Sequence, residues 1–238
     1  MCIRIGSRPS NLALKQVEEV KIKLEENYKI LSARYRHLDK FFNNGEVLFD
    51  VVRIRTKGDS DKITPISLVE NTDFFTDKIE SALLNGEIDA AIHSAKDLEE
   101  SVPNGLVVAG VTKTINAGEA FVSKCNFTLE NIPKGSIIGT SSISRKNNLL
   151  KYRPDIVVKD IRGNIEERLE QLKNNRYDAV IMAMAALIRL GMNDNNCFYV
   201  SEIPRDVMPS HPLQGSLAIE ARQDSHEIIE LFRIIDGK

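Results

Sequence analysis

The sequence predicts an α/β protein of two similar lobes, with mixed, mainly parallel sheets and a ligand cleft between the lobes. The first reason is an internal repeat. Three segments recur in the same order, namely 5–8 (IGSR) with 138–141 (IGTS), 51–53 (VVR) with 157–159 (VVK), and 89–92 (DAAI) with 178–181 (DAVI). The second reason is that polar residues follow the predicted strands. Ligands of open α/β sheets bind at the carboxyl ends of strands, so this pattern predicts a ligand site there.

Composition and charge exclude several classes of protein. The chain has 238 residues, enough for one or two domains with a sizeable core, and its 42% hydrophobic content is that of a globular protein. A net charge of −2 gives no electrostatic basis for binding nucleic acid. The longest apolar run, 179–188, is too short to span a bilayer, and residues 1–6 lack a signal-peptide core. Three widely spaced cysteines predict neither a disulfide framework nor a metal site. We therefore expect a cytoplasmic protein that binds no nucleic acid, membrane or metal.

The predicted elements alternate between strands and helices. Several strands are continuous β-branched runs, which are typical of a sheet covered by helices on both faces. The strands are predicted at 2–5, 49–54, 90–93, 106–111, 137–139, 156–160, 179–183 and 217–221, with a further short strand at 120–123. Helices are predicted at 11–26, 73–84, 144–152, 165–174 and 225–235. In the first helix, apolar residues recur at mostly helical spacing.

The remaining segments define the predicted lobes. Residues 25–46 have no counterpart in the second repeat and are interpreted as an insertion. Its KFFNNG stretch either connects the two strands of a hairpin or is a plain loop. Residues 113–118 and 204–212 are the expected crossings between lobes, where hinges of two-lobe proteins lie. Lobe 1 is therefore expected to comprise 1–112 and 213–238, and lobe 2 to comprise 118–207.

The segment 93–97 (HSAKD) is the main candidate for chemistry. It follows directly on the predicted strand 90–93. A carboxylate at Asp97 beside Lys96 has the chemistry to stabilise a cationic intermediate or to move protons. The alternative is a solvated turn with one surface ion pair, since polar turns after strands are common.

The second lobe offers further anion-binding candidates. Thr140, Ser141 and Ser142 lie between a strand and a helix start, where they either bind an anion or cap the helix, and Arg145 follows in the first turn. Gly163 permits a positive φ or close ligand approach beside Arg162 and Asn164, and Arg168 lies one helical turn further on. Arg168 alternatively pairs with a neighbouring glutamate on a solvated helix, and Arg189 alternatively extends to the surface.

Taken together, these candidates indicate a polyanion site. The cations that follow predicted strands of both lobes are Arg8, Lys96, Arg145, Arg162, Arg168 and Arg189. So many cations in one cleft of a protein with net charge −2 favour a polycarboxylate or polyphosphate ligand. Neither a dinucleotide fingerprint, a phosphate-binding loop nor a catalytic triad is found in the sequence.

Six ordered motifs make the sequence recognisable. They are IGSRPSNLALKQ at 5–16, TKGD at 56–59, HSAKD at 93–97, GTSS at 139–142, RPDIVVKDIRGN at 153–164 and AALIRLGM at 185–192. Over about residues 3–230, the sequence resembles the porphobilinogen deaminase (hydroxymethylbilane synthase) family. The resemblance implies lobes like those of type II periplasmic binding proteins. It also implies a cytoplasmic transferase, here expected to be a monomer, that condenses four porphobilinogen units into hydroxymethylbilane and releases ammonia in haem and tetrapyrrole biosynthesis.

The resemblance also assigns roles to residues. It implies that Asp97 is the catalytic carboxylate. It further implies that acetate and propionate groups of the substrate and of a dipyrromethane cofactor are bound by Arg8, Ser10, Lys96, Thr140, Ser141, Ser142, Arg145, Arg162, Gly163, Asn164, Arg168 and Arg189.

The sequence departs from the family pattern in ways that affect these expectations. The glycine-rich loop is replaced by residues 69–75, one of two arginines after GTSS is missing, and the family's Val-Gly-Gln-Gly stretch becomes 210–215. The family's third domain, with its cofactor-bearing cysteine, would lie beyond Lys238, so we expect that domain to be absent and dipyrromethane not to be attached covalently to Cys2, Cys125 or Cys197. A non-catalytic two-lobe binding protein for a pyrrole polycarboxylate or another small polyanion is the alternative.

Overall fold

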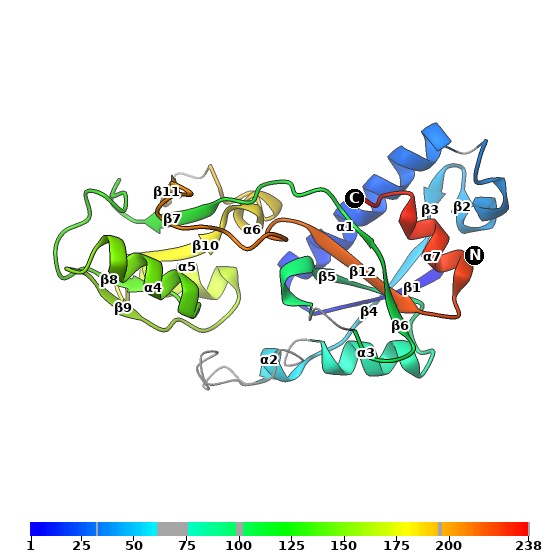
Figure 1. The fold of residues 1–238 in the computed structure, drawn as a ribbon, viewed down its shortest axis with the longest axis horizontal. Helices are drawn as coiled ribbons and strands as arrows, with labels where there is room; N and C mark the ends of the chain where they lie inside the picture. The colour runs from blue at the N-terminus through cyan, green and yellow to red at the C-terminus, as the bar shows by residue number, and fades with distance from the viewer. Residues whose placement is uncertain (32, 61–75, 99–101, 195–196, 238) are drawn as a thin grey trace. The chain divides into compact units, whose positions relative to one another are not determined.

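The computed structural model describes residues 1–31, 33–60, 76–98, 102–194 and 197–237 (Figure 1). The chain divides into two compact units. Within the described residues, unit 1 comprises 1–60, 76–114 and 216–237, and unit 2 comprises 115–215. Each unit is built on its own five-stranded sheet and is described by itself.

The sheet of unit 1 has the strand order β4-β1-β5-β12-β6. These strands are β1 (Ile3–Ser7), β4 (Phe49–Arg53), β5 (Ala90–Ser94), β6 (Leu106–Val111) and β12 (Leu217–Arg222). β1 pairs in parallel with β4 and β5, whereas β12 runs antiparallel to β5 and β6. β12, orange in Figure 1, comes from near the C-terminus yet lies between two strands from the first half of the chain. The carboxyl ends of β1, β4 and β5 therefore share one edge of this sheet.

Helices cover both faces of this sheet. On one face, α1 (Asn11–Leu31) and α7 (His226–Arg233) bury apolar side chains against the strands. On the other face, α3 (Asp77–Leu84) packs Ile79 and Leu83 against Ala91. The shorter elements are η1 (Arg36–Phe41), α2 (Lys57–Ser60) and the one-turn helix η4 (Ala95–Asp97).

The predicted insertion at 25–46 is only partly a separate segment. α1 continues through its first residues to Leu31, so the helix is longer than predicted. A small hairpin of β2 (Phe42–Asn43) and β3 (Glu46–Val47) then follows η1. Its turn residues Asn44 and Gly45 have φ values of 53° and 83°, the left-handed region that a two-residue hairpin turn requires. The Phe42 ring stacks on Tyr28 of α1, with ring centroids 3.7 Å apart.

Unit 2 repeats the strand order of unit 1. Its sheet has the order β11-β7-β10-β8-β9, built from β7 (Glu119–Ser123), β8 (Ile137–Gly139), β9 (Val157–Lys159), β10 (Ala179–Ala183) and β11 (Tyr199–Ile203). The helices are α4 (Ile143–Tyr152), α5 (Ile165–Lys173) and α6 (Met184–Arg189). β8 pairs in parallel with β9 and β10, and β7 runs antiparallel to β10 and β11. β8, β9 and β10 thus take the places that β1, β4 and β5 hold in unit 1, as the sequence repeat predicts.

One contact recurs in both units. In unit 1, the Asp89 carboxylate accepts a hydrogen bond from the Arg4 backbone N–H (2.9 Å), and the Asp89 N–H donates to the Arg4 carbonyl (2.8 Å). In unit 2, the Asp178 carboxylate accepts from the Ile137 N–H (2.7 Å), and the Asp178 N–H donates to the Ile137 carbonyl (2.8 Å). Asp89 therefore fastens the start of β5 to β1, and Asp178 fastens the start of β10 to β8.

The structure also corrects several predicted details. Mixed, mainly parallel sheets were predicted. The two large sheets are mixed, but among their described strands antiparallel pairings are as frequent as parallel ones. β11 and α6 were not predicted from the sequence. β1 begins at Ile3, so Cys2 lies outside the strand in which it was expected. The N-terminal part of the helix predicted at 73–84 lies outside the described residues, and the described helix begins at Asp77.

Candidate active site

The predicted site residues of unit 1 lie at the carboxyl edge of its sheet. Arg8 follows β1, Lys96 and Asp97 follow β5, and Asp59 lies in α2, which follows β4. The three strands pair in parallel, so the segments that follow them lie at the same edge. This placement agrees with the expectation for ligand-binding residues of an open α/β sheet.

Arg8 is held by a carboxylate of its own unit. Its Nε donates to Asp59 Oδ1 at 3.0 Å, and the other carboxylate oxygen accepts from the Thr56 backbone N–H (3.1 Å) and hydroxyl (3.0 Å). Burial raises the pKa of Asp59, but the hydrogen bonds and charge of Arg8 and the hydrogen bonds of Thr56 outweigh burial and leave the pKa below its usual value. Asp59 is therefore a carboxylate near neutral pH, and it fixes Arg8 in place. Sequence reasoning quoted Thr56 and Asp59 within a motif but assigned them no role.

Asp97 lies in a short turn that is anchored to the sheet. η4 begins at Ala95, which is buried and whose N–H donates to the Ser216 carbonyl at 3.0 Å. Lys96 and Asp97 are half-buried, whereas the first four residues of β5 are buried. A half-buried carboxylate at the end of a rigid strand can meet a ligand while part of its surroundings excludes water.

Ser10 has a structural role in this unit. Its hydroxyl accepts a hydrogen bond from the Ala13 N–H at 3.2 Å, as a side chain that caps the start of α1 does. Its carbonyl also accepts from the Leu14 N–H at 3.1 Å. The ligand-binding role implied for Ser10 stays a prediction.

A buried ionisable pair lies behind the Asp97 turn. His93 of β5 and Glu220 of β12 are 6% and 0% exposed, and His93 Nε2 lies 3.3 Å from Glu220 Oε2. Neither carboxylate oxygen of Glu220 forms a hydrogen bond with a described residue. Sequence reasoning missed Glu220, although a glutamate within the apolar run 217–221 was visible as an anomaly.

In unit 2, the serines after β8 serve the fold. Ser141 Oγ donates to the Ile161 carbonyl and accepts from the Ile161 N–H (3.2 Å), which ties the end of β8 to the segment after β9. Ser142 is the N-cap of α4 and accepts from the Arg145 N–H at 3.4 Å. The Thr140 hydroxyl accepts from the Ser142 N–H at 3.3 Å. The capping alternative is thus confirmed for Ser142, and anion binding by these residues stays a prediction.

Arg145 is enclosed by partners within unit 2. Its Nε donates to Glu119 Oε1 (3.1 Å), its Nη2 lies 2.7 Å from Glu119 Oε2, and Nη2 also donates to Gln214 Oε1 (3.5 Å). Glu119 and Gln214 are 4% and 1% exposed. Sequence reasoning assigned neither residue to the site: it quoted Gln214 only within the altered segment 210–215, and a glutamate at the start of a strand carries no recognisable pattern.

The segment after β9 is shaped by Gly163 and Asn164. Gly163 has a φ of +108°, so the predicted positive φ is confirmed. Asn164 and Glu167 form a reciprocal capping box at the start of α5. A Cβ on Gly163 would lie 2.7 Å from Glu167 Oε2, so a larger residue would disturb this cap. Arg168 Nε donates to the Gly163 carbonyl at 2.8 Å, and this bond holds the arginine against the loop that contains Arg162.

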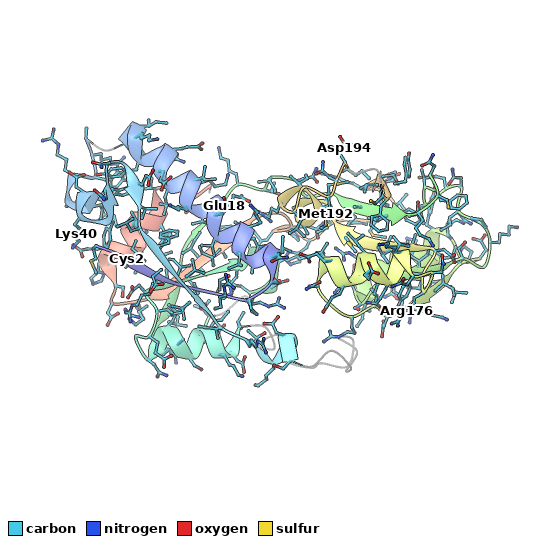
Figure 2. All side chains as sticks on the ribbon, turned by 180° about the vertical axis from the view of Figure 1, so that it is seen from behind. Cys2, Glu18, Lys40, Arg176, Met192 and Asp194 are labelled. Atoms are coloured by element: carbon cyan, nitrogen blue, oxygen red, sulfur yellow. The ribbon has the colours of Figure 1, made fainter. Side chains whose placement is uncertain are left out.

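Arg189 and the cysteines complete the predicted set. Arg189 ends α6, and its Nη2 donates to the Gly215 carbonyl at 2.9 Å. Cys2, labelled in Figure 2, is exposed, as are Cys125 and Cys197. In the described part of the chain, no group of His, Cys, Asp and Glu side chains has the arrangement of a metal site, and no helix is long and apolar enough to cross a bilayer.

Comparisons with known proteins give a family. The solved structure of an ancestral arginine-binding protein bound to arginine is 20% identical, with a TM-score of 0.47 over 97% of this chain and 88% of that one. The porphobilinogen deaminase of Bacillus pumilus is 40% identical over 231 residues, which cover 96% of this chain and 68% of that protein. The Listeria monocytogenes enzyme of the same name is 38% identical, over 98% of this chain and 70% of its own length.

The family match spans nearly all of the chain. Residues 3–230 match the family model described as porphobilinogen deaminase, dipyrromethane cofactor binding domain. The match includes Arg8, Asp97, Arg145 and Arg168, and so covers the strand-end segments of both units. The chain belongs to the porphobilinogen deaminase family.

Proposed function

We propose that this protein is a hydroxymethylbilane synthase, which joins four porphobilinogen molecules head to tail and releases one ammonia per unit. The observation that carries the proposal is the position of Asp97 after β5, in a chain that matches the deaminase family over residues 3–230. The reaction generates positive charge on a pyrrole, and a fixed carboxylate is the group that stabilises such a charge.

Asp97 acts on the charge that develops during condensation. In each step the C–N bond of an aminomethyl group breaks and ammonia leaves, which gives a cationic methylene-pyrrole. The free α-carbon of a second pyrrole then forms a bond to this methylene carbon and loses its proton. The Asp97 carboxylate accepts the pyrrole N–H and offsets the positive charge while the cation exists. η4 holds the carboxylate ready, because Ala95 is fixed to Ser216 before the substrate binds.

The acetate and propionate groups of the substrate require cations, and each unit has candidates in the segments that follow its strands. Arg8 and Lys96 supply them in unit 1, and Arg162 and Arg168 in unit 2, with Arg189 at the end of α6. Arginine suits this task because its planar donors match a carboxylate. Thr140 and Ser142 add hydroxyl groups beside the start of α4.

The donor set also fits a dipyrromethane, whose four carboxylate side groups resemble those of two substrate molecules. Arg145 retains a nitrogen, Nη1, that forms no hydrogen bond with any described residue and that a ligand carboxylate can use. When bound, the dipyrromethane supplies a pyrrole chain end with a free α-carbon for the first condensation. The residues that would hold its side groups are Arg145, Arg162 and Arg168, with Thr140 and Ser142.

The test is incubation of the purified protein with porphobilinogen. Consumption of porphobilinogen should be matched by release of ammonia and by uroporphyrin after acidification and oxidation. Asp97→Asn, which keeps the shape of the side chain but removes its charge, is the matched control. A wild-type protein that binds porphobilinogen but neither consumes it nor releases ammonia, with or without added dipyrromethane, would make this a binding protein.

We further propose that the protein is a monomer and acts in the cytoplasm. The substrate and product are small polycarboxylates, and each unit presents its own cations without a second copy of the chain. Light scattering of the purified protein at micromolar concentration should give the mass of one chain, and a dimer mass would contradict the monomer.

A further inference from the structure

Glu119 is a buried carboxylate whose only charged partner among the described residues is Arg145. It opens β7, where it lies opposite Ala183 of β10 and Ile203 of β11, so the strand is flanked on both sides. Glu119 is 4% exposed, and the side chain of Arg145 is 13% exposed. A carboxylate this deeply buried is stable only while its cation stays in place.

The contacts of Arg145 use one side of its guanidinium group. Nε donates to Glu119 Oε1, and Nη2 lies against Glu119 Oε2 and donates to Gln214. A guanidinium has five N–H donors, of which two belong to Nη1. Within the described part of the chain, Nη1 forms no hydrogen bond.

Gln214 helps to hold the guanidinium group of Arg145 in its orientation. Its Nε2 donates to the carbonyls of Ala117 (3.0 Å) and Gly118 (3.1 Å), which immediately precede Glu119. The amide therefore turns its oxygen toward Arg145. Glu119 and Gln214 together hold the guanidinium from two directions, and the helix start at α4 holds the backbone of Arg145 through Ser142.

We propose that Glu119 is a positioning residue that restricts Arg145 to a weak, one-nitrogen contact with a ligand carboxylate through Nη1. A ligand cannot displace Glu119, because that would leave a buried carboxylate without its cation. The charge of Glu119 also offsets that of Arg145, so an incoming carboxylate is attracted less strongly than by an unpaired arginine.

The consequence for the reaction rests on the proposed function. A growing pyrrole chain brings two carboxylates with every unit, and these groups must change their partners after each addition. A full two-nitrogen salt bridge at Arg145 would hold the chain in one place. A guanidinium that Glu119 has already partly neutralised can hold a carboxylate briefly and then release it.

The test uses a pyrrole that carries the acetate and propionate groups of porphobilinogen but no aminomethyl group. It binds through its carboxylates but cannot lose ammonia, so titration calorimetry reports affinity without turnover. Glu119→Gln keeps the size of the side chain and removes its charge. We expect this variant to bind the pyrrole dicarboxylate roughly tenfold more tightly, as one freed charge-assisted contact allows. With porphobilinogen as substrate, both KM and kcat should fall, because the product chain leaves more slowly.

Three controls decide the outcome. Glu170→Gln removes an exposed glutamate of α5 and should leave binding unchanged. Arg145→Gln should weaken binding, and adding Glu119→Gln to it should restore nothing, since the gain acts through Arg145. Should Glu119→Gln fail to fold, Glu119→Asp keeps the charge but shortens its reach, and a smaller increase in affinity is expected.

Unchanged or weaker binding by the folded Glu119 variants would show that the pair serves folding alone and would overturn the inference. Absence of dicarboxylate binding by every variant would do the same. The proposed function is judged separately by porphobilinogen consumption, so tighter binding without ammonia release would refute that function and leave the role of Glu119 standing.

Discussion

Removal of His93 should show how much the stability of unit 1 depends on one buried pair of ionisable side chains. In His93→Leu, Glu220 would keep its carboxylate at 0% exposure with no hydrogen bond from a described residue and without the imidazole 3.3 Å away. Its face of the sheet is apolar, with Ile79, Leu83 and Ala91 in the adjacent core, so nothing there replaces the lost partner. Leaving a buried polar group without its partner costs about 1–3 kcal/mol.

Urea unfolding followed by circular dichroism measures this cost on the full chain. His37→Leu is the matched control, because His37 lies 2.9 Å from Glu230 but the two side chains are 49% and 42% exposed. An exposed pair contributes about 0–1 kcal/mol, so this variant should unfold almost like the wild type. The double variant His93→Leu/Glu220→Leu should regain much of the lost stability, because it leaves neither of these buried polar groups without a partner. Equal effects of His93→Leu and His37→Leu would refute the reasoning.

Three further outcomes follow from the site. Asp97→Asn should lower kcat by on the order of 10²-fold with little change in thermal stability, and near-normal turnover would remove Asp97 from the chemistry. Arg168→Leu should raise KM for porphobilinogen roughly tenfold while the urea midpoint moves little; a markedly lower urea midpoint with unchanged KM would mean that the contact with Gly163 is the main role of Arg168. For Asp89, burial raises the pKa, but the hydrogen bonds and charge of Arg4 outweigh burial and lower it. The stabilisation is therefore present above the unfolded pKa of about 3.9 and is lost as pH falls through the lower folded value. Wild-type stability should drop below about pH 4 more steeply than that of Asp89→Asn, and parallel curves would contradict this.

The strands that the sequence predicts well are those with uninterrupted β-branched runs. β8 and β10 have their predicted bounds, because buried parallel strands carry only apolar residues. β6 also has its predicted bounds, since its run is apolar throughout, although it is an antiparallel edge strand. β11 escaped prediction because it mixes Ser201 and Glu202 with apolar residues at the edge of its sheet. The end of α1 was also missed, since the polar stretch after Glu26 hides that Tyr28 is buried against the core.

The candidate site could be predicted only in part for a similar reason. Its ligand-facing candidates follow strands and are rich in arginine, a pattern that a sequence displays. The residues that hold those arginines, Asp59, Glu119 and Gln214, come from distant segments and become neighbours only through the fold. Buried partners of this kind cannot be deduced from spacing, because their meaning depends on which strands pair.

The aspartates at the start of β5 and β10 set the alignment of each unit. Asp89 locks β5 against β1, and Asp178 locks β10 against β8, each through two hydrogen bonds to a single residue. A strand that slipped by one residue would turn every side chain to the opposite face. With the alignment locked, Ala91 of β5 lies opposite Gly6 of β1, and Val180 of β10 lies opposite Gly139 of β8. The two aspartates at the other end of these strands thus fix the position, along each sheet, of the segments that follow β5 and β10.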